Sequence, residues 1–222
     1  MPQRHIAGFR GKVDLLADRV RGRNVLHLGA VGETCEDTEV RVRRAVDSIH
    51  AVITRLAARC VGVDNDAPSV TALSERGMFD NLLLADVTKL TRRDIDLPAI
   101  DVVFAGDTIE HLAEPGRMLE VVNGLSDPHT QLVLTCPNAL GANLFLKNLR
   151  GREIEGADHV CSFNAYTLGN LVERYGWRVE ELWTCYQPKA ADFNPYTFRL
   201  GKAALNKFPR LGGTLFVVCS RS

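Results

Sequence analysis

Glycines or carboxylates follow four apolar runs of this sequence. They are Gly29 and Gly32 after NVLHL, Asp64 at the end of CVGVD, Asp86 at the end of NLLLAD, and Gly106 with Asp107 after IDVVFA. Glycine lets a ligand approach the backbone closely, and a carboxylate such as Asp64 can accept hydrogen bonds from both hydroxyls of a ribose. These residue types predict a binding site for a ligand that contains adenosine.

The residues around Gly32 distinguish between two such ligands. A nicotinamide dinucleotide needs a G-x-G-x-x-G turn that presents its pyrophosphate to the N-terminus of the next helix. Here Val31 and Glu33 stand in that turn, and a carboxylate roughly 4 Å from a phosphate charge costs about 4 kcal/mol at an effective dielectric constant of about 20. S-adenosylmethionine has no phosphate, and its sulfonium and ammonium groups are cationic. The acidic strand ends therefore favour S-adenosylmethionine over NAD.

Two histidines are candidates for the chemistry itself. A hydroxyl acceptor must lose its proton, and imidazole suits the role of base at neutral pH. His111 follows the fourth apolar run, and His159 lies at the end of a long segment after the fifth. The alternative for His111 is a structural role in orienting its loop, and the alternative for His159 is a hydrogen bond to Asp158 or a contact within a lid.

A metal site can also be built from this part of the sequence. Asp107, Glu110 and His111 lie within one helical turn, and oxygen-rich clusters of this kind bind Mg²⁺. The alternative is an ordinary helix start, where acidic residues are favourable. The sequence leaves the question of a metal open.

These residues need a parallel sheet to bring them together. Apolar runs alternate with amphipathic stretches along the chain, which predicts an α/β fold with a doubly wound, mostly parallel, Rossmann-like sheet and helices on both faces. The expected strands are 24–29, 60–64, 81–86, 100–105, 131–136, 177–184 and 214–219. A helix is expected to begin with a cap at Asp66 and to end at Gly77. Ligands of such sheets bind at the carboxyl ends of the strands, where the strand order reverses.

Two long connections are expected to cover the substrate. Residues 1–222 are predicted to form one domain, in which 137–164 and 186–213 are irregular, lid-like segments. Basic side chains can meet an anionic group of the acceptor, and aromatic side chains can wall its pocket. These residues are Lys147, Arg150, Arg152, Phe145, Phe163, Tyr186, Phe193 and Tyr196.

The composition argues against several kinds of partner. The 27 Lys and Arg balance 27 Asp and Glu, and the lack of a basic run argues against a nucleic-acid partner. Neither a signal-peptide pattern nor an apolar stretch of about 18 residues is found, so a cytoplasmic protein with no membrane partner is expected. The six cysteines have no C-x-x-C spacing and predict neither disulfides nor zinc. A homo-oligomer stays open.

The sequence resembles a class I S-adenosylmethionine-dependent methyltransferase, of the broad type that includes ubiquinone-biosynthesis-like and glycan-cluster enzymes. The resemblance covers about Leu15 to Cys219, and its clearest pieces are VLHLGAVGE, VGVDND, LLLADV and DVVFAGDTIEHLAEPGRML. It implies a seven-stranded sheet whose last strand is antiparallel. The sequence departs from the family at His27, Val31 and Glu33, where an acidic residue and two glycines are usual.

The resemblance also implies roles for the residues at the strand ends. Gly29, Ala30, Val31 and Gly32 would approach the methionyl part of the cofactor, Asp64 and Asn65 the ribose, Asp86 and Val87 the adenine, and Gly106 and Asp107 the sulfonium side. The expected function is O-methylation of a small-molecule acceptor such as a sugar, a nucleoside or a secondary metabolite, with His111 and His159 as the candidate catalytic residues. The alternatives are an NAD-dependent oxidoreductase and a non-catalytic cofactor-binding or scaffold protein.

Overall fold

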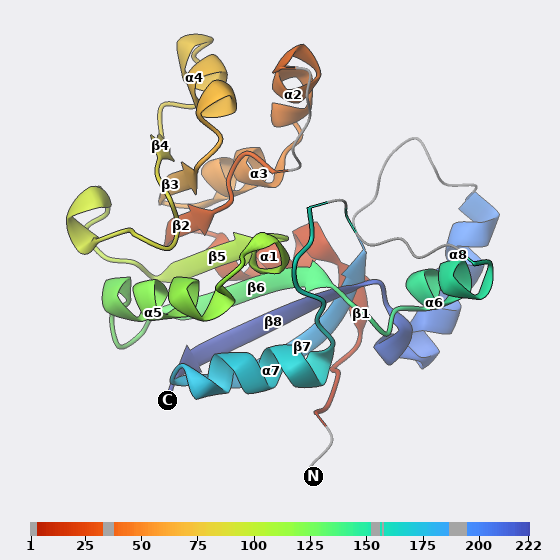
Figure 1. Cartoon of the computed structure of the whole chain (residues 1–222). Helices are drawn as coiled ribbons and strands as arrows, with labels where there is room; N and C mark the ends of the chain where they lie inside the picture. Colours follow the sequence, from red (N-terminus) through yellow and green to blue (C-terminus); the bar gives the residue numbers. More distant parts are fainter. Residues whose placement is uncertain (1–3, 33–37, 152–155, 157, 187–194) are drawn as a thin grey trace.

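The chain forms one β-sheet with helices on both faces (Figure 1). The computed structural model describes residues 4–32, 38–151, 156, 158–186 and 195–222. The strands are β1 (Phe9–Gly11), β2 (Asn24–Leu28), β3 (Arg59–Asp64), β4 (Leu82–Leu84), β5 (Val102–Gly106), β6 (Gln131–Pro137), β7 (Trp177–Tyr186) and β8 (Thr214–Arg221). Their order across the sheet is β1-β7-β8-β6-β5-β2-β3-β4.

The sheet confirms the predicted fold class and adds one strand. All seven expected strands are present, and β8 runs antiparallel to both β6 and β7 while the other neighbours are parallel. The eighth strand is β1, which pairs with β7 at the edge of the sheet. Its three residues are too few to show the alternation from which a strand is predicted.

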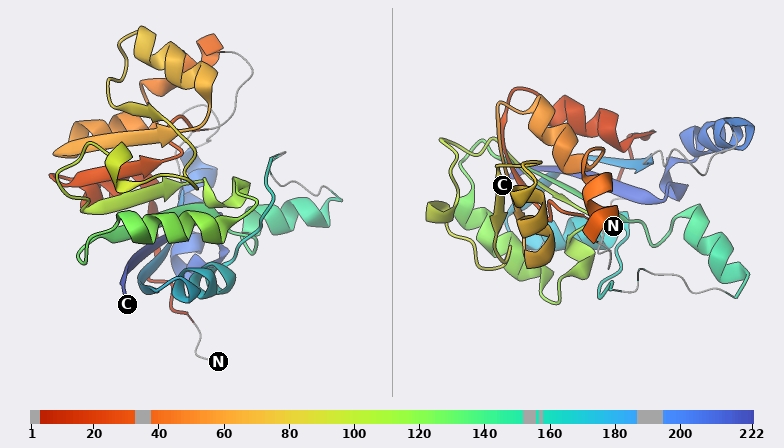
Figure 2. Two further views of the ribbon diagram at one scale, coloured as in Figure 1. Left: turned by 60° about the vertical axis from the view of Figure 1, so that its left-hand side comes forward. Right: turned by 90° about the horizontal axis from the view of Figure 1, so that it is seen from above.

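The helices cover both faces of the sheet (Figure 2). They are α1 (Lys12–Val20), α2 (Thr38–Ala45), α3 (Ile49–Leu56), α4 (Ala67–Glu75), α5 (Pro115–Leu125), α6 (Ala142–Leu149), α7 (Ala165–Arg174) and α8 (Pro195–Lys207). Apolar residues of α1 and α3 pack on one face of the sheet, and those of α5 and α7 pack on the other. The predicted cap of α4 is confirmed, because the Asp66 side chain accepts hydrogen bonds from the backbone and hydroxyl of Ser69. Within the described residues, we find no helix with the length and apolarity needed to cross a membrane.

Two segments that the sequence predicts to be irregular contain helices. Helix α6 lies within 137–164 and α8 within 186–213, and both lie at the same end of the molecule (Figure 2). None of the α6 residues is buried, and Leu146 and Leu149 are exposed. The prediction was wrong here because these apolar residues do not pack into the core, so their spacing was not attributed to a helix.

The strand order reverses beside β2. From β2 the chain continues through β3 to β4 in one direction, whereas β5 pairs with the other side of β2 and leads to β6. The carboxyl ends of these parallel strands meet at one edge of the sheet, which is the location of ligand sites in open α/β folds.

A pair of buried histidines lies between β2 and α3. Nδ1 of His27 lies 3.1 Å from Nδ1 of His50, and Nε2 of His50 lies 3.2 Å from Oδ1 of Asn81. Both imidazoles are almost completely buried. Desolvation lowers the pKa of His27 well below its usual value and lowers the pKa of His50 to about 4. Both rings are therefore neutral in the folded protein at pH 7.

We expect the free energy of unfolding to fall as the pH drops from 6.5 towards 4. In this range the unfolded chain binds protons at these histidines and the folded chain does not, so acid favours unfolding. At pH 5 the loss is about 2 kcal/mol for each histidine at most. Urea unfolding at pH 7.5 and pH 5.0 measures it. His50→Gln should show a smaller loss than the wild type and the exposed control His129→Gln the same loss; equal losses in all three would contradict the assignment.

Candidate active site

A glycine turn follows β2 at the point where the strand order reverses. Gly29 and Gly32 have φ angles of 71° and 82°, which only glycine adopts without strain. A Cβ atom on Gly29 would collide with the hydroxyl of Thr108, so the turn packs directly against the segment after β5. The backbone nitrogens of Gly29 and Ala30 donate to the carbonyl of Val63 at 2.9 and 3.1 Å, which fixes the turn beside β3.

Asp64 ends β3 next to this turn. Its Oδ2 accepts a hydrogen bond from the Val31 backbone at 2.9 Å, and its Oδ1 accepts one from the Asp66 backbone at 3.0 Å. The residue is 9% exposed. Each carboxylate oxygen can accept more than one hydrogen bond, so the geometry that orders the turn is compatible with contacts to a ligand. Asn65 is exposed immediately beside it.

Asp86 and Val87 follow β4 and differ in exposure. Thr88 donates to Asp86 from its backbone and from its hydroxyl, and Lys89 forms an ion pair with the same carboxylate at 3.0 Å. The hydrogen bonds from Thr88 lower the pKa of Asp86 to about 2. Val87 is buried and packs in the main core. The backbone of Ala85 donates a hydrogen bond to the carbonyl of Asp64. This bond brings the end of β4 next to Asp64, the residue that is expected to bind the ribose.

Asp107 follows Gly106 at the end of β5 and is paired with a buried lysine. Nζ of Lys12, whose side chain is 3% exposed, lies 2.5 Å from Oδ2 of Asp107, and the Thr135 hydroxyl donates to Oδ1 at 3.0 Å. Among the described residues other than glycine, Asp107 alone has a positive φ, at 50°. Left-handed backbone of this kind is costly and is concentrated at functional sites. Nothing in the sequence marks Lys12 as a residue of the site.

We expect Lys12→Met to lower the free energy of unfolding by about 1 to 3 kcal/mol. The substitution removes the cation and leaves the Asp107 carboxylate without its strongest partner, although Asp107 is half exposed and water can solvate it. Urea unfolding at pH 7.5 measures the loss. In the double variant Lys12→Met/Asp107→Asn part of the stability should return; strict additivity of the two single losses would show that the pair is not coupled.

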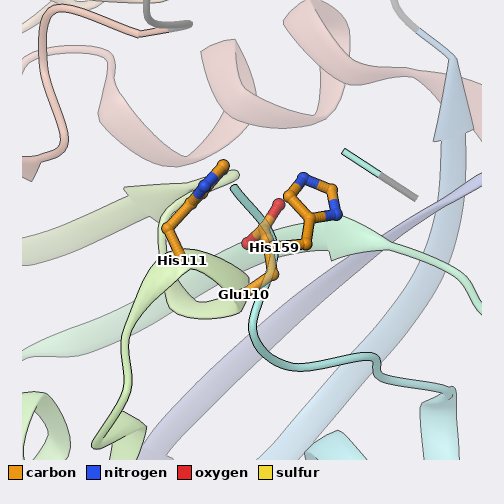
Figure 3. Close-up of side chains that lie close together, drawn as sticks. All are labelled: Glu110, His111 and His159. Atoms are coloured by element: carbon orange, nitrogen blue, oxygen red, sulfur yellow. The ribbon is translucent and has the colours of Figure 1, made fainter. Parts of the chain in front are cut away.

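Three further side chains converge beyond Asp107. Glu110 and His111 belong to the short helix η2 (Ile109–His111), and His159 comes from the segment after α6. Figure 3 shows the carboxylate of Glu110 close to the two imidazoles, and one donor atom from each residue lies within 4.8 Å of the others. Burial, reinforced by the charge of Asp107, raises the pKa of Glu110 to about 8.

A cavity of about 310 Å³ lies next to His159. Leu144 and Lys147 of α6 line it, together with Pro137 at the end of β6 and Thr214 at the start of β8. Its size is at the lower end of the range for small-molecule pockets. Lys147, one of the basic residues that the sequence predicts to contact the acceptor, therefore lines a cavity.

The family follows from a comparison with known proteins. A family model described as a methyltransferase domain matches residues 14–182, which is more than half of the chain. The chain belongs to this family. It is a class I methyltransferase, and its cofactor is S-adenosylmethionine. A search of curated proteins gave no match.

Solved structures support the same fold at low sequence identity. The methyltransferase is 14% identical to a SAM dependent methyltransferase from Archaeoglobus fulgidus, with a TM-score of 0.55 and 95% of each chain covered. Against magnesium protoporphyrin IX methyltransferase from Synechocystis PCC 6803 with bound SAH, the identity is 13% and the TM-score 0.58, over 95% of this chain and 82% of that one. Against the small RNA methyltransferase HEN1, the sequence identity is 14% and the TM-score is 0.60, over 100% of this chain and 27% of that one.

The residues of the methyltransferase fit this cofactor. The glycine turn leaves no room for a side chain at Gly29, and Asp64 presents a carboxylate at the end of the neighbouring strand. Lysines pair with two of the three strand-end carboxylates, Asp86 and Asp107. The site is thus less negative than its sequence indicates. The preference for S-adenosylmethionine over a dinucleotide therefore depends chiefly on the turn after β2. Glu33, which the sequence argument also used, lies outside the described residues.

The other residues that were expected to contact the acceptor differ in their positions. Phe163 is buried in the main core of the methyltransferase and does not line the cavity beside His159, whereas Phe145 is exposed on α6. The ring of Tyr186 contacts that of Phe9 at a tilt, with centroids 5.2 Å apart. Arg152 and Phe193 and the side chain of Tyr196 lie outside the described part of the chain. Sequence reasoning also missed the association of His159 with Glu110, for which no local signal exists because His159 comes 49 positions after Glu110.

Proposed function

We propose that this methyltransferase methylates a hydroxyl oxygen of a small molecule, with His111 and His159 as the catalytic residues. Gly29, Ala30, Val31 and Gly32, with the strand-end residues Asp64, Asn65, Asp86, Val87, Gly106 and Asp107, form the proposed cofactor site. The acceptor class is a sugar, a nucleoside or a secondary metabolite. The similarity of the DVVFAGDTIEHLAEPGRML segment to ubiquinone-biosynthesis-like and glycan-cluster enzymes is part of this proposal.

The cavity beside His159 carries the proposal. His159 and the basic side chain of Lys147 both line this cavity of about 310 Å³. Such a lining suits a small hydroxylated compound with an anionic or polar group. The balanced charge of the chain gives no support to a long polyanionic acceptor.

The bound cofactor supplies a methyl group on a positively charged sulfur, so the chain need only bind, orient and deprotonate the acceptor. His159 borders the cavity, and His111 lies beside it with ring centroids 4.7 Å apart. Nδ1 of His111 lies 3.1 Å from the Asp158 carboxylate, which orients the ring. These contacts support a role for the two imidazoles in loss of the hydroxyl proton.

We also propose that residues 1–222 act as one domain, with 137–164 and 186–213 covering the acceptor. Helix α6 supplies part of the cavity wall, and the backbone of Ala139 donates to the carbonyl of Phe163 at 2.8 Å. This bond ties the two ends of the first segment together, so that it returns to the sheet beside the site.

A screen with radiolabelled S-adenosylmethionine tests the proposal. Acceptors should include sugars, nucleosides, phenolic metabolites and short RNAs, and transfer to one small-molecule class is expected. Labelling of RNA alone would overturn the choice of acceptor. Thermal unfolding tests the alternatives: stabilisation by S-adenosylhomocysteine is expected, stabilisation by NAD alone would favour an oxidoreductase, and no effect of either would favour a scaffold protein.

A further inference from the structure

We infer that Glu110, His111 and His159 form a binding site for one divalent transition-metal cation. Their donor atoms lie within 4.8 Å of one another (Figure 3). Ligands bonded to a common cation at about 2.0 to 2.2 Å are at most about 4.4 Å apart. Small side-chain rotations are therefore sufficient to bring the three donors to bonding distance.

Glu110 is the strongest indication of a ligand. The residue is 1% exposed, and neither carboxylate oxygen has a hydrogen-bond partner in another described residue. A buried carboxyl group with no partner is unfavourable, and such groups in native proteins are paired or coordinate metals. Its carboxylate lies close to both imidazoles (Figure 3), so a cation bound there would be shared by all three side chains.

The backbone holds the two parts of the cluster together. The carbonyl oxygen of Glu110 accepts hydrogen bonds from the backbone nitrogens of Val160 at 2.9 Å and Cys161 at 3.0 Å. These bonds fix the chain immediately after His159 against the short helix that carries Glu110 and His111. The position of His159 is thus set by main-chain contacts and not only by its own side chain, as a specific metal site requires.

The environment of His111 matches that of a metal ligand, whereas that of His159 must change on binding. Nδ1 of His111 lies 3.1 Å from a carboxylate oxygen of Asp158, and a metal-bound histidine commonly donates its second ring nitrogen to a carboxylate in this way. Nε2 of His111 is then the ligand atom. Nδ1 of His159 accepts a long hydrogen bond of 3.3 Å from the Gly156 backbone, and coordination through Nε2 requires this bond to break.

The donor set determines the class of cation. Two imidazoles and one carboxylate suit Zn²⁺, Fe²⁺, Co²⁺ and similar ions, whereas Mg²⁺ and Ca²⁺ prefer oxygen ligands throughout. The structure pairs Asp107 with Lys12, so the oxygen-rich cluster of Asp107, Glu110 and His111 expected from the sequence is replaced by one with two nitrogen donors. Three protein ligands leave at least one position for another oxygen, as in catalytic zinc sites.

A role for this cation in catalysis rests on the proposed function. His159 borders the cavity, so an acceptor hydroxyl there can take the remaining coordination position. Binding to the cation lowers the pKa of the hydroxyl, and its proton passes to water while the cation keeps its charge. His111 and His159 would then promote deprotonation by holding the cation.

Titration of tag-free, metal-depleted protein with Co²⁺, without cofactor or acceptor, tests the site. We expect one equivalent to bind, with visible absorption bands that report nitrogen and oxygen ligands. Glu110→Gln and His159→Ala should weaken binding at least tenfold, and the exposed control His129→Ala should bind as the wild type does. Absence of saturable binding by the wild type, or equal affinity in Glu110→Gln, would overturn the inference.

Two further measurements complete this test. Glu110→Gln should unfold at a temperature no lower than the wild type and retain binding of S-adenosylhomocysteine, because glutamine preserves the shape of the side chain; with both retained, weak Co²⁺ binding reports the lost ligand. Equimolar Mg²⁺ should not displace Co²⁺, and displacement would overturn the preference for a transition metal. Because metal binding is measured without methyl transfer, its failure is distinguishable from failure of the acceptor screen.

Discussion

Replacing Asp64 by asparagine is expected to weaken binding of S-adenosylhomocysteine at least about 30-fold, or about 2 kcal/mol. Asparagine keeps the size of the side chain but removes its charge and offers one acceptor oxygen in place of two. Hydrogen bonds to an ionised group contribute about 1.5 to 3 kcal/mol each, and the proposed ribose contacts use two of them. The same change weakens one of the contacts to the Val31 and Asp66 backbone that order the site. Isothermal titration calorimetry measures the difference.

Asp66→Asn is the matched control for this prediction. It makes the same chemical change two positions later, where the side chain caps α4, and asparagine caps a helix about as well as aspartate. Its affinity for S-adenosylhomocysteine should stay within about threefold of the wild type, which is under about 1 kcal/mol. Equal losses in Asp64→Asn and Asp66→Asn would mean that Asp64 has no special role in the cofactor site.

His159→Ala is expected to reduce turnover about 10²- to 10⁴-fold while binding of S-adenosylhomocysteine changes little. The loss follows whether the imidazole takes the hydroxyl proton itself or holds a cation that lowers the pKa of the hydroxyl. Cofactor binding should persist because His159 belongs to the segment after α6, whereas the glycine turn follows β2 and Asp64 ends β3. Initial rates with a saturating acceptor, compared with calorimetry, separate the two effects.

The exposed residue His129 provides the reference for that experiment. His129→Ala removes an imidazole from the loop between α5 and β6, so turnover and cofactor affinity should both match the wild type. Wild-type turnover in His159→Ala would exclude His159 from the chemistry. A parallel loss of turnover and of cofactor affinity would instead indicate that the variant disturbs the whole site.

The architecture could be predicted because burial imposes its pattern on the sequence. The parallel strands β5 and β6 are covered on both faces, so they consist of near-continuous apolar runs. The cap at Asp66 is equally local, because one carboxylate satisfies donors three positions away. Strand β1 and helix α6 have no such signal, because one is three residues long and the other packs no residue into the core.

The site was predictable only in part, for a related reason. Strand-end residues such as Gly29 and Asp64 are located as soon as the strands are, because the carboxyl ends of parallel strands share an edge. Lys12 is different: nothing in its neighbourhood along the chain shows that its ammonium group will reach Asp107, 95 positions later. Its burial depends on the packing of α1 against the sheet.

The sequence by itself therefore determined the sheet, the glycine turn and the strand-end carboxylates of this methyltransferase, because backbone preference and apolar periodicity act over short distances along the chain. Only the tertiary structure decided which charges are neutralised and which donors meet. It paired Asp107 with Lys12 and placed His159 beside Glu110 and His111. Such pairings depend on distances in space between residues far apart in sequence, and those distances are fixed only when the helices pack on the sheet.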